Sequence, residues 1–121
     1  MWERERYISL VTYKRNGDGV ETPVWFAPLD GHYYVFSEGD AYKVKRLRKN
    51  AAVRAASCRM LGTVTGEWVA GRGRIVSDDT RLVARAEAAF VTKYGWQIRL
   101  FDAVSKLAGK YPKRAWLELT F

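Results

Sequence analysis

Apolar residues fall into short stretches of alternating or continuous hydrophobicity that end at turn residues. The alternating stretches predict six strands, at residues 7–13, 20–27, 33–37, 51–58, 62–76 and 116–121. Pro23 cannot donate to a ladder, so we expect the second strand to lie at a sheet edge or to be bulged. The many glycines between 62 and 76 predict a long, strongly bent strand, as a barrel corner requires.

Three other stretches repeat their apolar residues at helical spacing. Val44 and Leu47 give a short basic segment, 40–50, one narrow apolar stripe. Ser77-Asp78-Asp79 predicts the start of a longer helix that ends at Lys93-Tyr94-Gly95. Ile98, Phe101, Val104 and Leu107 predict another helix, closed by Gly109 and Pro112. We expect one α+β domain over 1–121, mainly β, built as a six-stranded barrel with inserted helices.

Charge changes this picture at one place. The formal net charge of the 121 residues is +8, and it falls to +3 without the five cations Lys43, Lys45, Arg46, Arg48 and Lys49. A solvated basic helix that keeps the protein soluble would explain this cluster. Because the helix follows an aromatic strand and a turn, its first turn also offers free amides, a positive dipole end and Lys43, which together make a phosphate site.

The residues that could do chemistry are few. His32 is the sole histidine and Cys58 the sole cysteine, which argues against a metal site, a disulfide and a histidine-activated nucleophile. No spaced carboxylate pair is evident, so we predict no catalytic side chain and no metal ligand. If the protein is an enzyme, a bound redox cofactor supplies the reactivity.

The sequence also bears on compartment. A single cysteine fits a reducing environment, and neither a signal-like start nor an apolar run of about 20 residues is present. We expect a cytoplasmic protein with no membrane partner.

Several motifs together resemble the pyridoxamine-phosphate-oxidase-like split β-barrel proteins, and among them the small class of coenzyme F420-dependent enzymes. The motifs are Leu10-Val11-Thr12-Tyr13, Thr22-Pro23-Val24-Trp25-Phe26, Lys43-Val44-Lys45-Arg46-Leu47-Arg48, Cys58-Arg59, Gly73-Arg74-Ile75 and Lys93-Tyr94-Gly95-Trp96. The resemblance implies a homodimer of six-stranded split barrels with two cofactor sites at the interface, each holding a deazaflavin or FMN.

The resemblance also implies roles for residues. Lys43 would bind the cofactor phosphate, the strand from Thr22 to Trp25 would line the ring, and Ser37 would lie near the ribityl-phosphate arm. Trp68 of the second subunit would complete the pocket. The candidate cofactor-binding residues are Val20, Thr22, Pro23, Val24, Trp25, Ser37, Lys43, Arg46, Arg48 and Trp68.

Three departures from the pattern of these proteins matter. Ala41-Tyr42-Lys43 stands where relatives often have Ser-Gly-Lys or Ser-Arg-Lys, so Arg46 and Arg48 would have to compensate for a missing contact. Asn50-Ala51 replaces the frequent Asn-Pro after the helix. Gly66 and Glu67 occupy the region where FMN-using oxidases place a glutamine, which favours coenzyme F420 over FMN.

Three functions remain open. The first is an oxidoreductase that moves a hydride between coenzyme F420, or alternatively FMN, and a small unsaturated substrate. A non-enzymatic flavin or deazaflavin binder would share every binding residue and differ only in turnover. The least favoured is a nucleic-acid binder, because only Tyr42 lies within the basic cluster as a stacking platform, and we expect no specific nucleic-acid binding.

Overall fold

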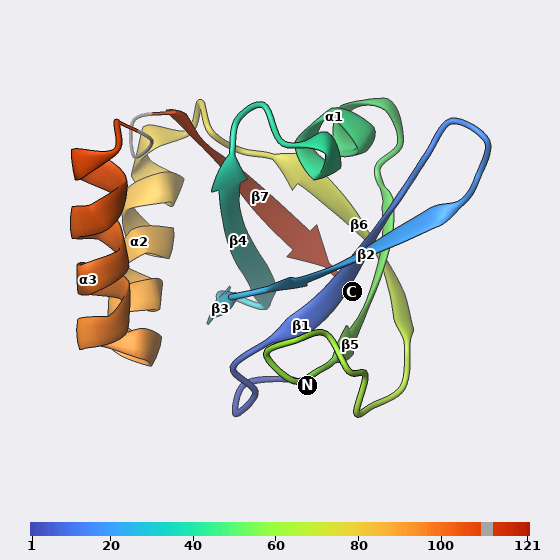
Figure 1. Ribbon diagram of the computed structural model, residues 1–121, viewed down its shortest axis with the longest axis horizontal. Helices are drawn as coiled ribbons and strands as arrows, with labels where there is room; N and C mark the ends of the chain where they lie inside the picture. Colours follow the sequence, from blue (N-terminus) through green and yellow to red (C-terminus); the bar gives the residue numbers. More distant parts are fainter. Residues whose placement is uncertain (110–112) are drawn as a thin grey trace.

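The structure is a computed structural model that describes residues 1–109 and 113–121. Its described residues form seven strands and three helices (Figure 1). In chain order these elements are β1 (Ile8–Tyr13), β2 (Gly19–Val24), β3 (Ala27–Leu29), β4 (His32–Glu38), α1 (Tyr42–Lys49), β5 (Ala52–Ser57), β6 (Val69–Ile75), α2 (Thr80–Tyr94), α3 (Trp96–Leu107) and β7 (Arg114–Thr120).

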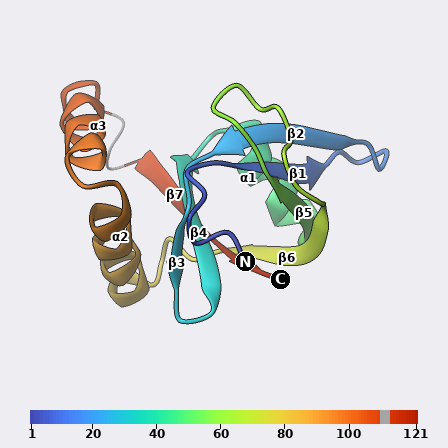
Figure 2. The ribbon, with the colours of Figure 1, turned by 90° about the horizontal axis from the view of Figure 1, so that it is seen from below.

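All seven strands belong to one antiparallel sheet with the order β2-β1-β5-β6-β7-β4-β3. The two outermost strands, β2 and β3, are consecutive in the sequence and are joined only by Trp25 and Phe26. Such a short connection between opposite edges requires the sheet to curl until its edges approach each other, as Figures 1 and 2 show. The result is a barrel split along the line between β2 and β3.

The predicted strand 20–27 is therefore wrong as one element, and the predicted count of six strands becomes seven. The cause lies at Phe26, whose backbone bonds to α2 instead of to a strand. Its N–H donates to the Tyr94 hydroxyl at 3.1 Å, and its carbonyl accepts from Lys93 Nζ and from the Tyr94 hydroxyl, each at 3.0 Å. Because these groups are satisfied by side chains, the ladder can break here without an orphaned polar group.

The predicted strand 62–76 is also shorter than expected. Only β6 is regular, and residues 58–68 fold back along β5 through an isolated Cys58–Val64 bridge and a bond from Thr65 N–H to the Ser57 carbonyl. Glycine serves close approach rather than bending at Gly71, where a Cβ atom would lie 2.4 Å from the Thr120 carbonyl oxygen. The remaining predicted strands are confirmed within one or two residues, as β1, β4, β5 and β7.

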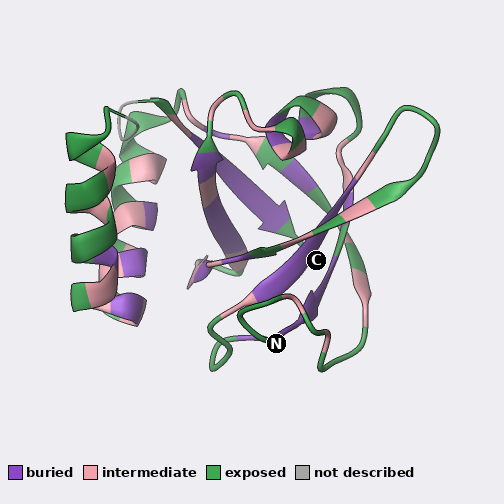
Figure 3. Ribbon diagram, in the orientation of Figure 1, coloured by how far each residue is buried: buried purple, intermediate pink, exposed green. Residues whose placement is uncertain are grey.

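The barrel interior holds the main core (Figure 3). Its buried members are Trp2, Ile8, Leu10, Val24, Phe26, Tyr33, Val35, Leu47, Val53, Ala55, Leu117 and Leu119. Helix α1 packs against β1 and β6 and buries Val44 and Leu47, the two residues of the predicted stripe. This anchorage fixes where the basic side chains of α1 stand.

A second core lies between α2 and the outer face of β3, β4 and β7. Helix α2 begins at the Asp79 cap, whose carboxylate accepts from Leu82 N–H at 3.1 Å, and ends at Gly95, which has φ +60°. Helix α3 follows directly and buries only Ile98. Its other large apolar residues, here called the α3 stripe, are exposed: Trp96, Leu100, Phe101, Val104 and Leu107. Pro112, the expected stop signal after α3, lies outside the described residues.

Within the described ranges, the helices are too short or too polar to cross a lipid bilayer.

Candidate cofactor site

The start of α1 brings two predicted site residues together. Ser37 lies near the end of β4, and Lys43 lies in the first turn of α1, directly after the turn that joins the two elements. The Lys43 ammonium donates to the Ser37 hydroxyl at 3.2 Å. No side chain caps this helix, because its cap residue is Ala41. Lys43, the Ser37 hydroxyl and the uncapped first turn therefore form one corner that suits a phosphate.

Lys43 is half-buried, and this has an electrostatic consequence. Burial lowers the pKa of its ammonium, the nearby Arg46 guanidinium lowers it further, and Glu38 partly opposes the shift. A bound anion would offset both unfavourable contributions, because it supplies a counter-charge where water has been removed. A phosphate bound at this corner would therefore favour the charged form of Lys43.

Arg46 connects the corner to the edge strand. Its Nε atom donates to Thr12 Oγ1 at 2.8 Å, and Thr12 pairs with Val20 in the β1–β2 ladder. The Arg46 side chain is thus held against β1 near the beginning of β2. Arg46 and Val20, both predicted site residues, are therefore linked through Thr12.

Beside Arg46 lies a surface hollow of about 580 Å³ between α1 and the β1–β2 turn, here called the basic hollow. Its lining is Tyr13, Lys14, Arg15, Tyr42, Lys45, Arg46, Lys49 and Asn50. Sequence analysis missed the contribution of Lys14 and Arg15, which lie about 30 positions from α1 along the chain. The sequence did place them directly after β1 and before the Asn16-Gly17 turn, which was the one indication that they lie at the end of this hairpin. Lys45 Nζ lies 5.3 Å from the ring centre of Tyr42.

On the other side of Ser37 lies an aromatic hollow of about 390 Å³ between the end of β4 and α3. Phe36, Ser37, Glu38, Phe101, Val104, Ser105, Ala108 and Arg114 line it. Phe101 is the central ring, with its centre 5.6 Å from that of Phe36 and 5.5 Å from that of Trp25. Trp25 in turn stacks on Tyr94 at 4.9 Å.

These aromatic contacts connect two distant predictions. Trp25 was expected to line the cofactor ring and Ser37 to lie near its phosphate arm, and Phe101 links the two residues through space. Phe101 itself was assigned only to a helix stripe in the sequence. Its contact with Trp25 could be recognised only after the β2–β3 break placed Trp25 next to α3.

Arg114 fixes the wall of the aromatic hollow. Its guanidinium carbon lies 4.1 Å from the Phe36 ring centre and 5.4 Å from that of Phe101. It also pairs with Asp102 at 2.9 Å and donates to Ser105 Oγ at 3.2 Å. The cation therefore holds α3 to β7 and leaves the aromatic rings in a defined position.

The other predicted residues are not all on one surface. Along β2, half-buried or buried Val20, Thr22 and Val24 alternate with exposed Glu21 and Pro23, so Pro23 faces the opposite side from Thr22. Arg48 is exposed on α1.

Trp68 lies directly before β6, below the Arg54 guanidinium at 5.0 Å, whereas α1 packs over Gly73 further along that strand. A single copy of the chain therefore does not bring Trp68 to Lys43.

Metal-binding groups do not gather anywhere in residues 1–109 and 113–121: these ranges contain no cluster of three histidine, cysteine, aspartate or glutamate side chains that could hold an ion. Cys58 is buried, and burial raises the pKa of its thiol. A raised pKa disfavours the thiolate, so Cys58 behaves as a core residue, as expected.

No protein-family model and no curated protein matches the sequence. Solved structures do match it over nearly its whole length. The heme storage protein HutZ of Vibrio cholerae is 14% identical, with a TM-score of 0.71, 96% of this chain and 81% of that chain covered. An FAD-binding protein of Mesorhizobium loti is 15% identical, with a TM-score of 0.63 and coverage of 98% and 81%.

A protein of Listeria innocua assigned as a pyridoxamine 5′-phosphate oxidase is 12% identical, with a TM-score of 0.62 and coverage of 98% and 85%. The chain spans about half, 47%, of the length of another match, a protein of unknown function from Agrobacterium tumefaciens. The three better-covered structures share the curled antiparallel sheet described above. The chain therefore has the split β-barrel fold of the pyridoxamine 5′-phosphate oxidase-like proteins.

Proposed function

We propose that this protein binds a flavin-type cofactor, coenzyme F420 or FMN, and uses it as an oxidoreductase on a small unsaturated substrate. The observation that carries the proposal is the contact between Lys43 and Ser37 at the uncapped start of α1. A half-buried ammonium, a hydroxyl and free helix amides at one point fit a phosphate monoester or diester.

The aromatic hollow is the other half of this proposal. It shares Ser37 with the phosphate corner, and Phe36 and Phe101 offer rings on which a flat tricyclic ring can stack. The FAD-binding protein and the assigned pyridoxamine 5′-phosphate oxidase support a flavin-type ligand through their shared fold. A bound flavin or deazaflavin would supply the hydride chemistry, and the chain would bind and orient it and keep water from its ring.

Coenzyme F420 is the ligand we favour over FMN. Gly66 and Glu67 stand where FMN-using oxidases carry a glutamine. The basic hollow also adds cations beyond those that a single phosphate needs, which suits a cofactor with a longer anionic arm. A non-enzymatic carrier of the same cofactor is the alternative, and only turnover separates the two.

We further propose a homodimer. The tryptophans Trp25, Trp68 and Trp116 do not offer an exposed apolar surface for a second copy, because Trp116 is buried and the other two are half-buried. The α3 stripe does offer one, with Trp96 71% and Leu107 89% exposed. A second copy that covered this stripe would also cover the aromatic hollow, since Phe101 and Val104 belong to both.

The test begins with the absorbance spectrum of the purified protein, followed by fluorescence titration with oxidised coenzyme F420 and with FMN. Tighter binding of coenzyme F420 than of FMN, at micromolar concentration or below, is the expected result. Loss of the reduced cofactor on addition of an unsaturated ketone such as cyclohexenone would then separate an enzyme from a carrier. Failure of both cofactors to bind would overturn the proposal.

A further inference from the structure

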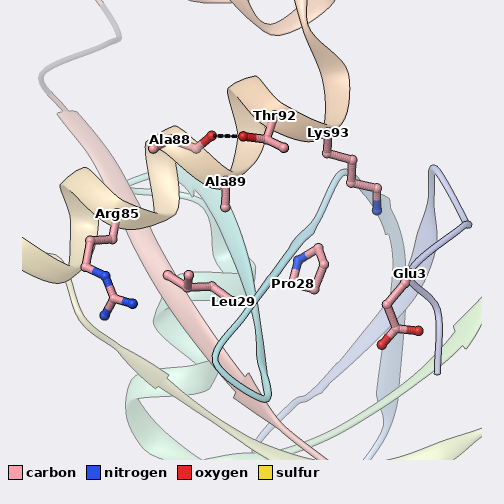
Figure 4. Close-up of a pocket in the computed structure, with 8 residues that line it drawn as sticks. All are labelled: Glu3, Pro28, Leu29, Arg85, Ala88, Ala89, Thr92 and Lys93. Carbon is pink, nitrogen blue, oxygen red and sulfur yellow. Dashed lines mark hydrogen bonds between the residues drawn. The ribbon is translucent and has the colours of Figure 1, made fainter.

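A third recess lies between α2 and β3 (Figure 4). This α2–β3 trough has a volume of about 580 Å³ and is lined by Glu3, Pro28, Leu29, Arg85, Ala88, Ala89, Thr92 and Lys93. Small residues on α2 leave the space open above Pro28 and Leu29. The body of the trough is therefore apolar, and its charged groups stand at the ends.

The charges at the two ends are not equivalent. Arg85 forms an ion pair with Asp30, and Glu3 forms one with the amino group of Met1. Lys93 instead donates to the Phe26 carbonyl at 3.0 Å and stands 3.2 Å from the ring centre of the buried Phe26. An ammonium carries three N–H donors. Lys93 therefore has N–H donors beyond the one bonded to Phe26, and these can bind an anion.

We propose that the α2–β3 trough binds a small organic acid with an apolar body, whose carboxylate pairs with Lys93. The apolar body would lie between Ala88, Ala89 and Leu29, as Figure 4 allows, with the acid at the Lys93 end. Charge complementarity selects this ligand over a neutral one. The proposal is independent of the cofactor site at Lys43, because the trough shares no residue with the basic hollow or the aromatic hollow.

The surroundings of Lys93 predict how binding depends on pH. Burial and, secondly, the Arg6 guanidinium lower the pKa of Lys93 to about 8, although the Glu3 and Glu5 carboxylates oppose the shift. Tyr94, the other titratable neighbour, has its ring centre 5.2 Å from Lys93 Nζ, and its phenol has a pKa raised to about 12 by burial. Lys93 therefore loses its charge between pH 7 and pH 9.5, and an organic acid should bind less well across that interval.

The experiment uses the fluorescent probe 2-naphthoate and its neutral isostere 2-naphthamide, titrated into the full chain. We expect 2-naphthoate to bind more tightly than 2-naphthamide at pH 7, and the advantage to disappear by pH 9.5. Lys93→Met should weaken 2-naphthoate roughly 10-fold or more and 2-naphthamide less than about 2-fold. Lys93→Arg should restore most of the loss, and Ala89→Leu should weaken both probes by narrowing the trough.

Lys43→Met removes one half-buried ammonium at the other anion site, and it should weaken 2-naphthoate less than Lys93→Met does. The pH series on the unaltered protein needs no variant, so a folding defect in Lys93→Met would not remove the test. Equal affinity for the two probes at pH 7, or a larger loss in Lys43→Met than in Lys93→Met, would overturn the proposal.

Discussion

The hydroxyl of Tyr94 lies within hydrogen-bond distance of both backbone groups of Phe26, 3.1 Å from its nitrogen and 3.0 Å from its carbonyl oxygen. The same hydroxyl lies 2.7 Å from the Arg6 carbonyl oxygen. One buried side chain at the end of α2 thereby fastens the segment between the two edge strands. Two stretches far apart in the sequence meet at this point and hold the barrel in its split form.

Tyr94→Phe removes this fastening and keeps the ring. The Phe26 N–H would lose its acceptor in a buried site, so we expect a loss of about 1–3 kcal/mol in the free energy of unfolding. Urea unfolding followed by circular dichroism measures it. Tyr42→Phe is the control, since Tyr42 is 74% exposed and should change stability by less than about 0.5 kcal/mol. Similar losses in the two variants would contradict this account of the β2–β3 break.

Lys93, the neighbour of Tyr94, predicts a dependence of stability on alkaline pH. Burial lowers its pKa to about 8 in the folded protein, whereas an unfolded lysine has a pKa of about 10.4. The unfolded chain therefore binds more protons between these values, so Lys93 favours the folded state increasingly as pH rises from about 8 toward 10. NMR titration of ¹³C-labelled lysine side chains should show this low pKa directly.

The matching stability measurement compares the unaltered protein with Lys93→Met at pH 7.5 and pH 9.5. The urea midpoint of the unaltered protein, relative to that of the variant, should be higher at pH 9.5 than at pH 7.5. A difference that stays constant would mean that Lys93 is already fully solvated.

How much of this could be predicted from the sequence depends on the range of the interactions involved. The strands at β1, β4, β5 and β7 and all three helices follow from local hydrophobic periodicity, and the structure confirms them, although the cap of α2 is Asp79 and not the Ser77 hydroxyl. The burial of Val44 and Leu47 followed from the same reasoning. Local pattern sufficed wherever the partner of a residue lay in its own element.

Pattern failed where a distant residue decided the outcome. The sequence of residues 20–27 does not indicate that Tyr94 and Lys93 hydrogen-bond to the backbone of Phe26. These bonds divide the predicted strand. The apolar residues of α3 have the spacing of a buried helix face, yet only Ile98 is buried, because α2 already covers the outer face of β4 and β7. Lys14 and Arg15 join the basic hollow only through the position of α1.

Glu118 supports a prediction at acid pH. It is buried on β7, accepts from Tyr34 at 2.6 Å and from Arg74 Nε at 2.7 Å, and the Arg74 hydrogen bond is the main cause that lowers the pKa of its carboxyl. A lowered carboxyl pKa gives stability that is present above the unfolded value of about 4.3 and is lost as pH falls through the folded value.

Tyr34→Phe should therefore cost about 1.5–3 kcal/mol at pH 7, because it removes a hydrogen bond to a buried charge, and less at pH 3. Arg74→Ala should cost about 1 kcal/mol or less, since the arginine side chain is 66% exposed. Arg72→Ala, an exposed arginine on the same strand, is the control. Urea unfolding at both pH values measures the difference, and a cost that does not diminish at pH 3 would show that the Glu118 charge is not involved.

The α3 stripe provides the test of the proposed dimer. Leu100 is 58% exposed, and a charge there would be placed in the interface if a second copy covers the stripe. Leu100→Glu should shift the protein from dimer to monomer in light scattering at micromolar concentration without altering its circular dichroism. Arg99→Glu changes an exposed neighbour on α3 and should leave the mass unchanged. If the unaltered protein is monomeric at this concentration, the proposal is contradicted.

Lys43 and Lys49 provide the decisive comparison for the cofactor site, because they carry the same charge at opposite ends of α1. Lys43 stands in the first turn with Ser37 and the free amides, whereas Lys49 is the exposed last residue of the helix. A charge-assisted contact with phosphate contributes about 1.5–3 kcal/mol, so Lys43→Ala should weaken cofactor binding roughly 10 to 150-fold. Lys49→Ala should cost well under about 1 kcal/mol, because its charge is screened and distant.

Arg46→Ala should fall between them, because its guanidinium is held by Thr12 at 2.8 Å beside the basic hollow and also disfavours the Lys43 charge. Its removal takes away one cation near the phosphate but relieves part of the repulsion on Lys43, and these effects oppose each other. The three variants are titrated with coenzyme F420 at fixed salt, with circular dichroism as the check on folding. Equal losses for Lys43→Ala and Lys49→Ala would mean that α1 acts through its bulk charge alone, and the phosphate corner at Ser37 would then have no specific role.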